Sequence, residues 1–134
     1  MLSTDQLDTW FTYHPPTEEQ KPKYAAITMK HRALADLFSI ENLREERFTH
    51  DDINRELRAF VETIDAHSPD SADKVAAVRC VRIARNGLNE ALVETHRVMT
   101  TGGRAHWPIA LLHDTALTEL LKARWQANSA IACE

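Results

Sequence analysis

The chain has 134 residues, of which 43% are hydrophobic and 27% charged, a composition typical of one folded domain and not of a disordered tail. Only 3 glycines and 5 prolines are present, too few for the turns of an all-β sandwich, so long helices are favoured. The formal net charge is −4 with no basic tract, which argues against binding to long nucleic acid. No run approaches ~18 consecutive apolar residues, so no membrane span is expected.

The sequence contains neither a secretion signal nor a cysteine motif. The opening residues lack the charged-then-apolar pattern of a secretion signal. Cys80 and Cys133 lie far apart without CxxC spacing, so neither a disulfide framework nor a zinc site is indicated. We therefore expect a reducing, cytoplasmic environment.

The first third of the chain predicts a short helix, a stiff loop and a long helix. Residues 3–10 have a capped helical turn with Leu7 and Trp10 on one side. Pro15 and Pro16 then disfavour helix and hold the aromatic segment from Phe11 extended. Apolar residues recur at near-helical spacing from Tyr24 to Phe38, which predicts a first long helix over about 18–39.

Three further helices complete the predicted architecture. A charged stretch at 40–47 precedes cap chemistry at 49–52 and a predicted helix over about 50–66. A second break at 68–71 precedes a helix that runs to about Thr100, where Gly102 and Gly103 end it. Pro108 opens the last helix, which continues to near residue 131. We predict one all-α domain over 1–134 with four helices.

Metal and nucleophilic chemistry have weak support. No two of the 7 histidines share the i, i+4 spacing that places imidazoles on one helix face. His31, the His50-Asp51 pair and Asp114 resemble the ligand order of a metal phosphohydrolase, although Thr49, His50 and Asp51 also suit a helix cap. No Gly-x-Ser-x-Gly elbow or phosphate loop occurs. We assign no catalytic residue and no metal ligand.

The loop around Tyr13 is the most informative feature of the sequence. A ring held by two prolines, and not on a periodic helix face, can stack on a nucleobase, although it can also pack under the loop. The helix start that follows offers unpaired N–H groups, and nearby lysines add positive charge. Arg79, Arg82 and Arg85 span too wide an arc for a core stripe, so some of them face solvent, a ligand or a partner.

Two segments resemble phage-encoded sponge proteins that sequester immune signals, the anti-CBASS cyclic-oligonucleotide sponge and its Thoeris-blocking relatives. The first is the run Phe11 to Pro16 followed by Gln20 and residues 24–27. The second is a helix, for which both 69–93 and 108–132 have matching residues. The resemblance implies a shared helical hairpin, elaborated here to about four helices, with about 25 additional residues inserted within 28–56.

The resemblance also implies a function. Such proteins bind cyclic di- or trinucleotides or cyclic ADP-ribose isomers without degrading them and need no cofactor. They form homo-oligomers, commonly hexamers. The family's usual basic residue is Thr28 here, so Lys30 or Arg55 is its expected replacement. The implied ligand-binding residues are Phe11, Thr12, Tyr13, His14, Pro15, Lys30, Arg55, Arg79, Arg82 and Asn89. The alternatives are a metal-dependent phosphohydrolase of the same ligands and a helical protein-interaction module.

Overall fold

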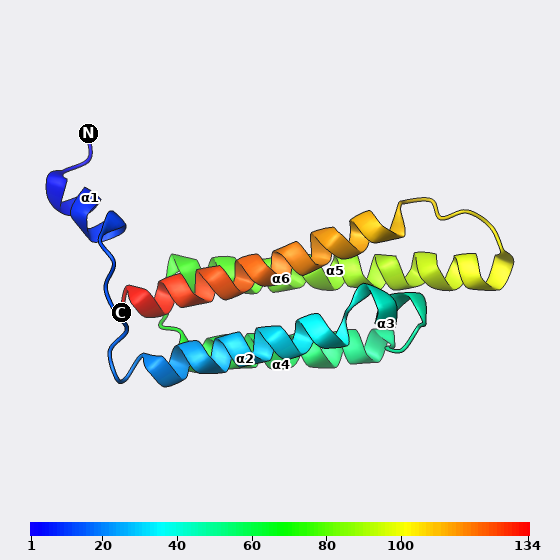
Figure 1. Ribbon diagram of the computed structural model, residues 1–134, viewed down its shortest axis with the longest axis horizontal. Coiled ribbons are helices and arrows are strands. Elements are labelled where there is room, and N and C mark those ends of the chain that lie inside the picture. The colour runs from blue at the N-terminus through cyan, green and yellow to red at the C-terminus, as the bar shows by residue number, and fades with distance from the viewer.

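The computed structural model describes all 134 residues and is entirely helical (Figure 1). It contains six helices in chain order: α1 (Thr4–Phe11), α2 (Lys21–Leu37), α3 (Ile40–Arg44), α4 (His50–His67), α5 (Ala72–Thr101) and α6 (Ile109–Ala132). The all-α prediction is confirmed. None of the helices is both long and apolar enough to cross a membrane.

Helices α2, α4, α5 and α6 run side by side with alternating direction and form an elongated bundle (Figure 1). Their apolar faces meet in one core whose largest fully buried side chains include Phe38, Phe60, Leu88 and Leu120. Burial of such side chains contributes about 1.5–3 kcal/mol each. This core holds the four long helices in fixed positions.

The most extensive packing in the bundle joins α5 to α6. Buried alanines recur every seven residues on both helices, at positions 77, 84 and 91 of α5 and 116, 123 and 130 of α6. A seven-residue interval keeps residues on one face of paired helices, and small side chains let the two backbones approach closely. The approach is close at Gly87, where an added Cβ would lie 3.1 Å from the Cβ of Ala116.

The helix ends follow the cap residues that the sequence suggests. Thr49 and Asp52 form a reciprocal capping box at the start of α4, and Ser71 accepts the N–H of Lys74 at the start of α5. Gly102 adopts the left-handed conformation that ends α5, with φ of 68°. These caps explain why the predicted bounds of α4 and α5 agree with the structure to within a few residues. The bounds of α2 and α6, which have no side-chain cap bond, agree as closely.

Two expectations need correction. The charged stretch 40–47 contains the short helix α3, capped by Ser39, and its Leu43 is fully buried. Val75 and Val93 belong to the apolar series of residues 75–93 in the sequence, but both face outward in the structure. Three of the eight buried residues of α5 are alanines, which carry a weaker apolar signal than valine or leucine.

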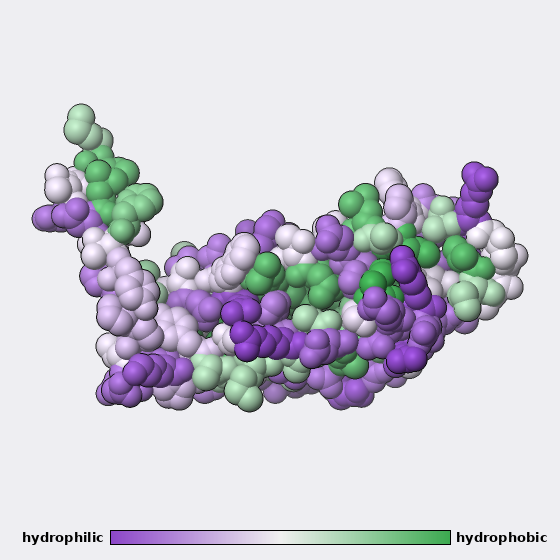
Figure 2. Space-filling view, in the orientation of Figure 1, coloured by the Kyte–Doolittle hydropathy of each residue, from purple (hydrophilic) through white to green (hydrophobic).

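The N-terminal arm, residues 1–16, differs from the rest of the molecule. Helix α1 stands off one end of the bundle (Figure 1), and none of its residues is buried. A capping box formed by Ser3 and Gln6 stabilises its first turn. Its apolar side chains remain uncovered and form a separate patch beyond the bundle (Figure 2).

Candidate ligand-binding site

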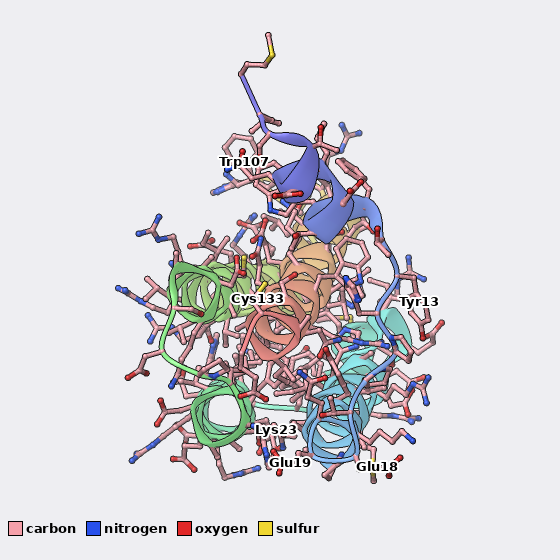
Figure 3. All side chains as sticks on the ribbon, turned by 90° about the vertical axis from the view of Figure 1, so that its left-hand side faces the viewer. Tyr13, Glu18, Glu19, Lys23, Trp107 and Cys133 are labelled. Carbon is pink, nitrogen blue, oxygen red and sulfur yellow. The ribbon has the colours of Figure 1, made fainter.

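The loop predicted to carry Tyr13 is extended and exposed. Helix α1 ends at Phe11, and Thr12 has extended backbone angles. The segment regains a turn at Thr17, whose hydroxyl accepts the N–H of Gln20 at 3.2 Å. Gln20 then anchors the loop to the bundle, because its Nε2 donates to the carbonyl of Ile131 at 3.0 Å. Tyr13 is 81% exposed and extends away from the helices (Figure 3), so it is not a packing residue of this chain.

A hollow of about 740 Å³ lies between this loop and the end of the bundle. Four segments of the chain line it: the end of α1 with the loop, the start of α2, the start of α5 and the end of α6. The lining residues are Thr9, Trp10, Thr12, Tyr13, His14, Pro15, Gln20, Tyr24, Asp73, Ser129, Ala132 and Cys133. Its volume is within the range of small-molecule sites.

Aromatic rings, hydroxyl groups and one carboxylate dominate the wall of the hollow. Burial, followed by the charge of Glu134, raises the pKa of Tyr24. Its hydroxyl can donate a hydrogen bond to a ligand. Lys23 is occupied by Glu134, with Nζ 2.7 Å from Oε1. No lysine or arginine lines the hollow. Positive charge for a phosphate must therefore come from outside this wall.

Lys30 and Arg55 lie elsewhere, in ion pairs. Lys30 Nζ is 3.1 Å from Oε2 of Glu56, which links α2 to α4. Arg55 Nη2 is 2.6 Å from Oδ1 of Asp52, one turn back on α4. Neither residue lines the hollow. In a single chain, both are structural partners of carboxylates, and their contact with a ligand stays a prediction.

Arg79, Arg82 and Asn89 also lie apart from the loop. The two arginines line a groove of about 270 Å³ on α5, together with Lys74, Val75 and Val78. Asn89 is further along α5, where its Oδ1 is 2.5 Å from Nδ1 of His50. The predicted ligand-binding residues therefore fall into four separate places in one chain. Residues 12–15 share the hollow and Arg79 and Arg82 share the groove, whereas Phe11, Lys30, Arg55 and Asn89 line neither.

The ligand set of the phosphohydrolase alternative is not assembled in this chain. His31 is buried beside Arg124, with Nδ1 and Nη1 3.4 Å apart, while His50 contacts Asn89. Burial first, and then the charges of Arg124 and Arg32, lower the pKa of His31. No group of three or more histidine, cysteine or carboxylate side chains is placed to hold a metal ion. Thr49, and not His50 or Asp51, provides the cap of α4.

A second cavity, of about 540 Å³, lies where the start of α4 meets the later part of α5. Phe48 and Leu92 form its apolar floor, and His50 and His96 lie at its rim. His96 Nδ1 is 2.8 Å from Oε2 of Glu46, so the ring is already fixed by a carboxylate. No sequence pattern predicts this cavity, because residues 46–50 and 92–100 meet only through the packing of the helices.

Comparison of the chain with protein-family models, with curated proteins and with solved structures finds no match. The functional argument therefore depends on the residues and on their geometry.

Proposed function

We propose that this protein is a phage counter-defence sponge, which binds a cyclic oligonucleotide or a cyclic ADP-ribose isomer in the host cytoplasm and releases it unchanged. The observation that carries the proposal is the exposed ring of Tyr13 at a hollow of about 740 Å³. An aromatic ring that is exposed on a stiff segment can stack on a base at little entropic cost. The resemblance of residues 11–27 to the sponge family supports the same function.

The loop residues have complementary roles in this proposal. Tyr13 stacks on a base, while Thr12 and His14 donate or accept hydrogen bonds at ribose or phosphate. Pro15 keeps the segment extended, and Phe11 contributes apolar contact at the end of α1. Tyr24, Ser129 and Cys133 extend the wall on the bundle side. No step of this mechanism breaks a bond in the ligand.

The phosphate groups need cations that the hollow lacks. Arg79 and Arg82 form no ion pair and no side-chain hydrogen bond within the chain, so they are available to neutralise a phosphate. They do not reach the hollow of their own chain. We therefore propose that the protein acts as a homo-oligomer, with a hexamer as the expected state, in which one copy supplies these arginines to another.

The test is incubation with a panel of cyclic di- and trinucleotides and cyclic ADP-ribose isomers, followed by removal of unbound compound, heat denaturation and chromatography of the released molecule. We expect one compound to be retained and released intact. An altered product, lost after addition of a chelator, would identify a metal-dependent enzyme instead. No retained compound from the whole panel would contradict the sponge function.

Two variants test the role of the ring. Removing a stacking aromatic costs about 1–3 kcal/mol, so Tyr13→Ala is expected to weaken binding by about 5- to 150-fold. Tyr13→Phe keeps the ring and is expected to retain most of the affinity. Trp107→Ala is the matched control, because Trp107 is exposed and lies in the α5–α6 connection, at the far end of the bundle from the loop (Figure 1). Calorimetric titration of all three, with melting curves, separates binding from folding.

A further inference from the structure

The outward side of the first half of α5 is basic and apolar. Between Asp73 and Glu90 the helix carries Lys74, Arg79, Arg82 and Arg85 and no acidic residue. The groove there has Val75 and Val78 between the basic side chains, and Val75 is 61% exposed. Lys74 is engaged by Asp65 and Asp70, at 2.7 and 3.0 Å. The three arginines take part in none of the ion pairs of the chain.

Helix α1 has the complementary character. Leu7, Trp10 and Phe11 lie on one side of the helix and are 41%, 60% and 81% exposed. Asp8 lies next to Phe11 at the edge of this apolar side, Asp5 lies on the opposite side of the helix, and the helix contains no basic residue. Neither aspartate has an ion-pair partner in the chain.

We infer that α1 of one copy docks in the Lys74–Arg82 groove of a second copy. The apolar side of α1 would cover Val75 and Val78, while Asp8 at its edge would pair with one of the two groove arginines, Arg79 or Arg82, and leave the other for a phosphate. Opposite charges around an apolar contact align two surfaces and suppress other partners. The inference rests on the self-association proposed above, and it does not depend on ligand binding.

The geometry favours a second copy over the chain's own groove. Helix α1 projects from the end of the bundle (Figure 1), and the segment behind it is fixed by Pro15, Pro16 and the bond from Gln20 to Ile131. Folding α1 back onto the groove of its own α5 would require residues 12–14, between α1 and this fixed segment, to leave their present conformation. A contact between two different surfaces is heterologous, so mutual exchange produces a pair and successive exchange produces a ring.

The test is charge reversal of each surface in the full chain, with the mass measured by sedimentation across micromolar concentrations. Asp5→Lys with Asp8→Lys, and separately Arg79→Glu with Arg82→Glu, are each expected to weaken self-association by about tenfold or more. Arg47→Glu with Arg104→Glu is the control for net charge, because both residues are exposed and lie outside the groove. This control is expected to associate like the wild type.

Mixing the two reversed chains distinguishes exchange between copies from docking within one chain. Each chain then meets a partner with opposite charge, so association is expected to recover in the mixture while each variant alone stays dissociated. A monomeric wild type, unchanged association of the variants, or no recovery on mixing would overturn the inference. Binding of a monomeric wild type to anionic lipid vesicles, lost in Arg79→Glu with Arg82→Glu, would assign the groove to a membrane surface instead.

Ligand capture is measured on the same samples, so that the two proposals can fail separately. A wild type that associates through α1 and retains no cyclic nucleotide would contradict the sponge function alone. A wild type that retains a ligand and associates equally well after charge reversal would contradict the docking of α1 alone.

Discussion

The N-terminal arm and the four-helix bundle have the same local helix signals but differ in burial. Both α1 and α4 begin with a capping box, and both have an amphipathic pattern. Helix α4 buries Ile53, Leu57, Phe60 and Ile64, whereas α1 buries nothing. The difference shows that caps and periodicity determine where a helix forms, while burial depends on what faces it. The uncovered apolar side of α1 is the observation on which the proposed docking between copies rests.

The strongest test of this contrast is the same substitution in each region. Phe60→Ala removes a fully buried ring and is expected to lower the free energy of unfolding by about 3–5 kcal/mol. Phe11→Ala is expected to change it by less than about 0.5 kcal/mol, because the ring is exposed. Urea denaturation followed by circular dichroism, at a concentration where the chain is dissociated, measures both. Similar losses would show that the arm packs on its own bundle.

A second comparison separates the inner and outer sides of α5. Gly87→Leu places a large side chain where even a Cβ is only 3.1 Å from Ala116, and we expect a loss of about 1–3 kcal/mol in stability. Asn86→Leu introduces the same side chain one residue earlier, at an exposed position, and this matched control is expected to be nearly neutral. Thermal melting of both variants decides whether α5 and α6 are packed as closely as described.

The two capping boxes provide a smaller effect. Thr49→Ala removes the hydroxyl that accepts the N–H of Asp52 at 3.1 Å, and about 1 kcal/mol of global stability is expected to be lost. Ser3→Ala removes the equivalent acceptor for Gln6 in α1 and is expected to leave the global transition unchanged. Hydrogen exchange is expected to detect only local loosening of α1 in the second variant. A shift in the midpoint of global unfolding for Ser3→Ala would show that the stability of the arm depends on the bundle.

The smallest expected effect is the pH dependence introduced by His31. Burial lowers its pKa in the folded chain below the unfolded value of 6.5, so the unfolded chain binds its proton first as the pH falls. This residue therefore costs no stability above pH 6.5 and destabilises the fold progressively below it. His31→Gln is expected to flatten that part of the stability profile, measured by urea midpoints between about pH 5 and 8. An unchanged slope would show that His31 does not contribute to it.

The four long helices were predictable from the sequence because their ends carry explicit signals. Gly102 and Pro108 bracket the connection between α5 and α6, and Ser71 and Thr49 begin helices where expected. Helix α3 was missed because glutamates and arginines surround its single buried leucine. The close packing of α5 with α6 was also missed, since its signal is a seven-residue repeat of alanine and not of larger apolar residues.

The sequence predicted the loop of the candidate site but not the rest of its wall. Paired prolines beside an aromatic residue identified the loop, because that combination is local. Tyr24, Asp73 and Ser129 were not predicted as walls of the hollow, since three distant segments meet there only after folding. The partner of Lys30 is Glu56, 26 residues away, and only the packing of α2 against α4 brings them together.

The two thiols of the chain differ in exposure, and the more exposed one lies at the hollow, where it can be labelled selectively. Cys133 is exposed at the wall of the hollow, near the end of α6 (Figure 3). Cys80 is half-buried, and burial, with the nearby Glu119, raises the pKa of its thiol. Because the thiolate is the reactive form, a limiting amount of maleimide dye should attach to Cys133 first. The native chain thus carries its own attachment point for an optical reporter, whose emission would respond to occupancy of the neighbouring space without any engineered residue.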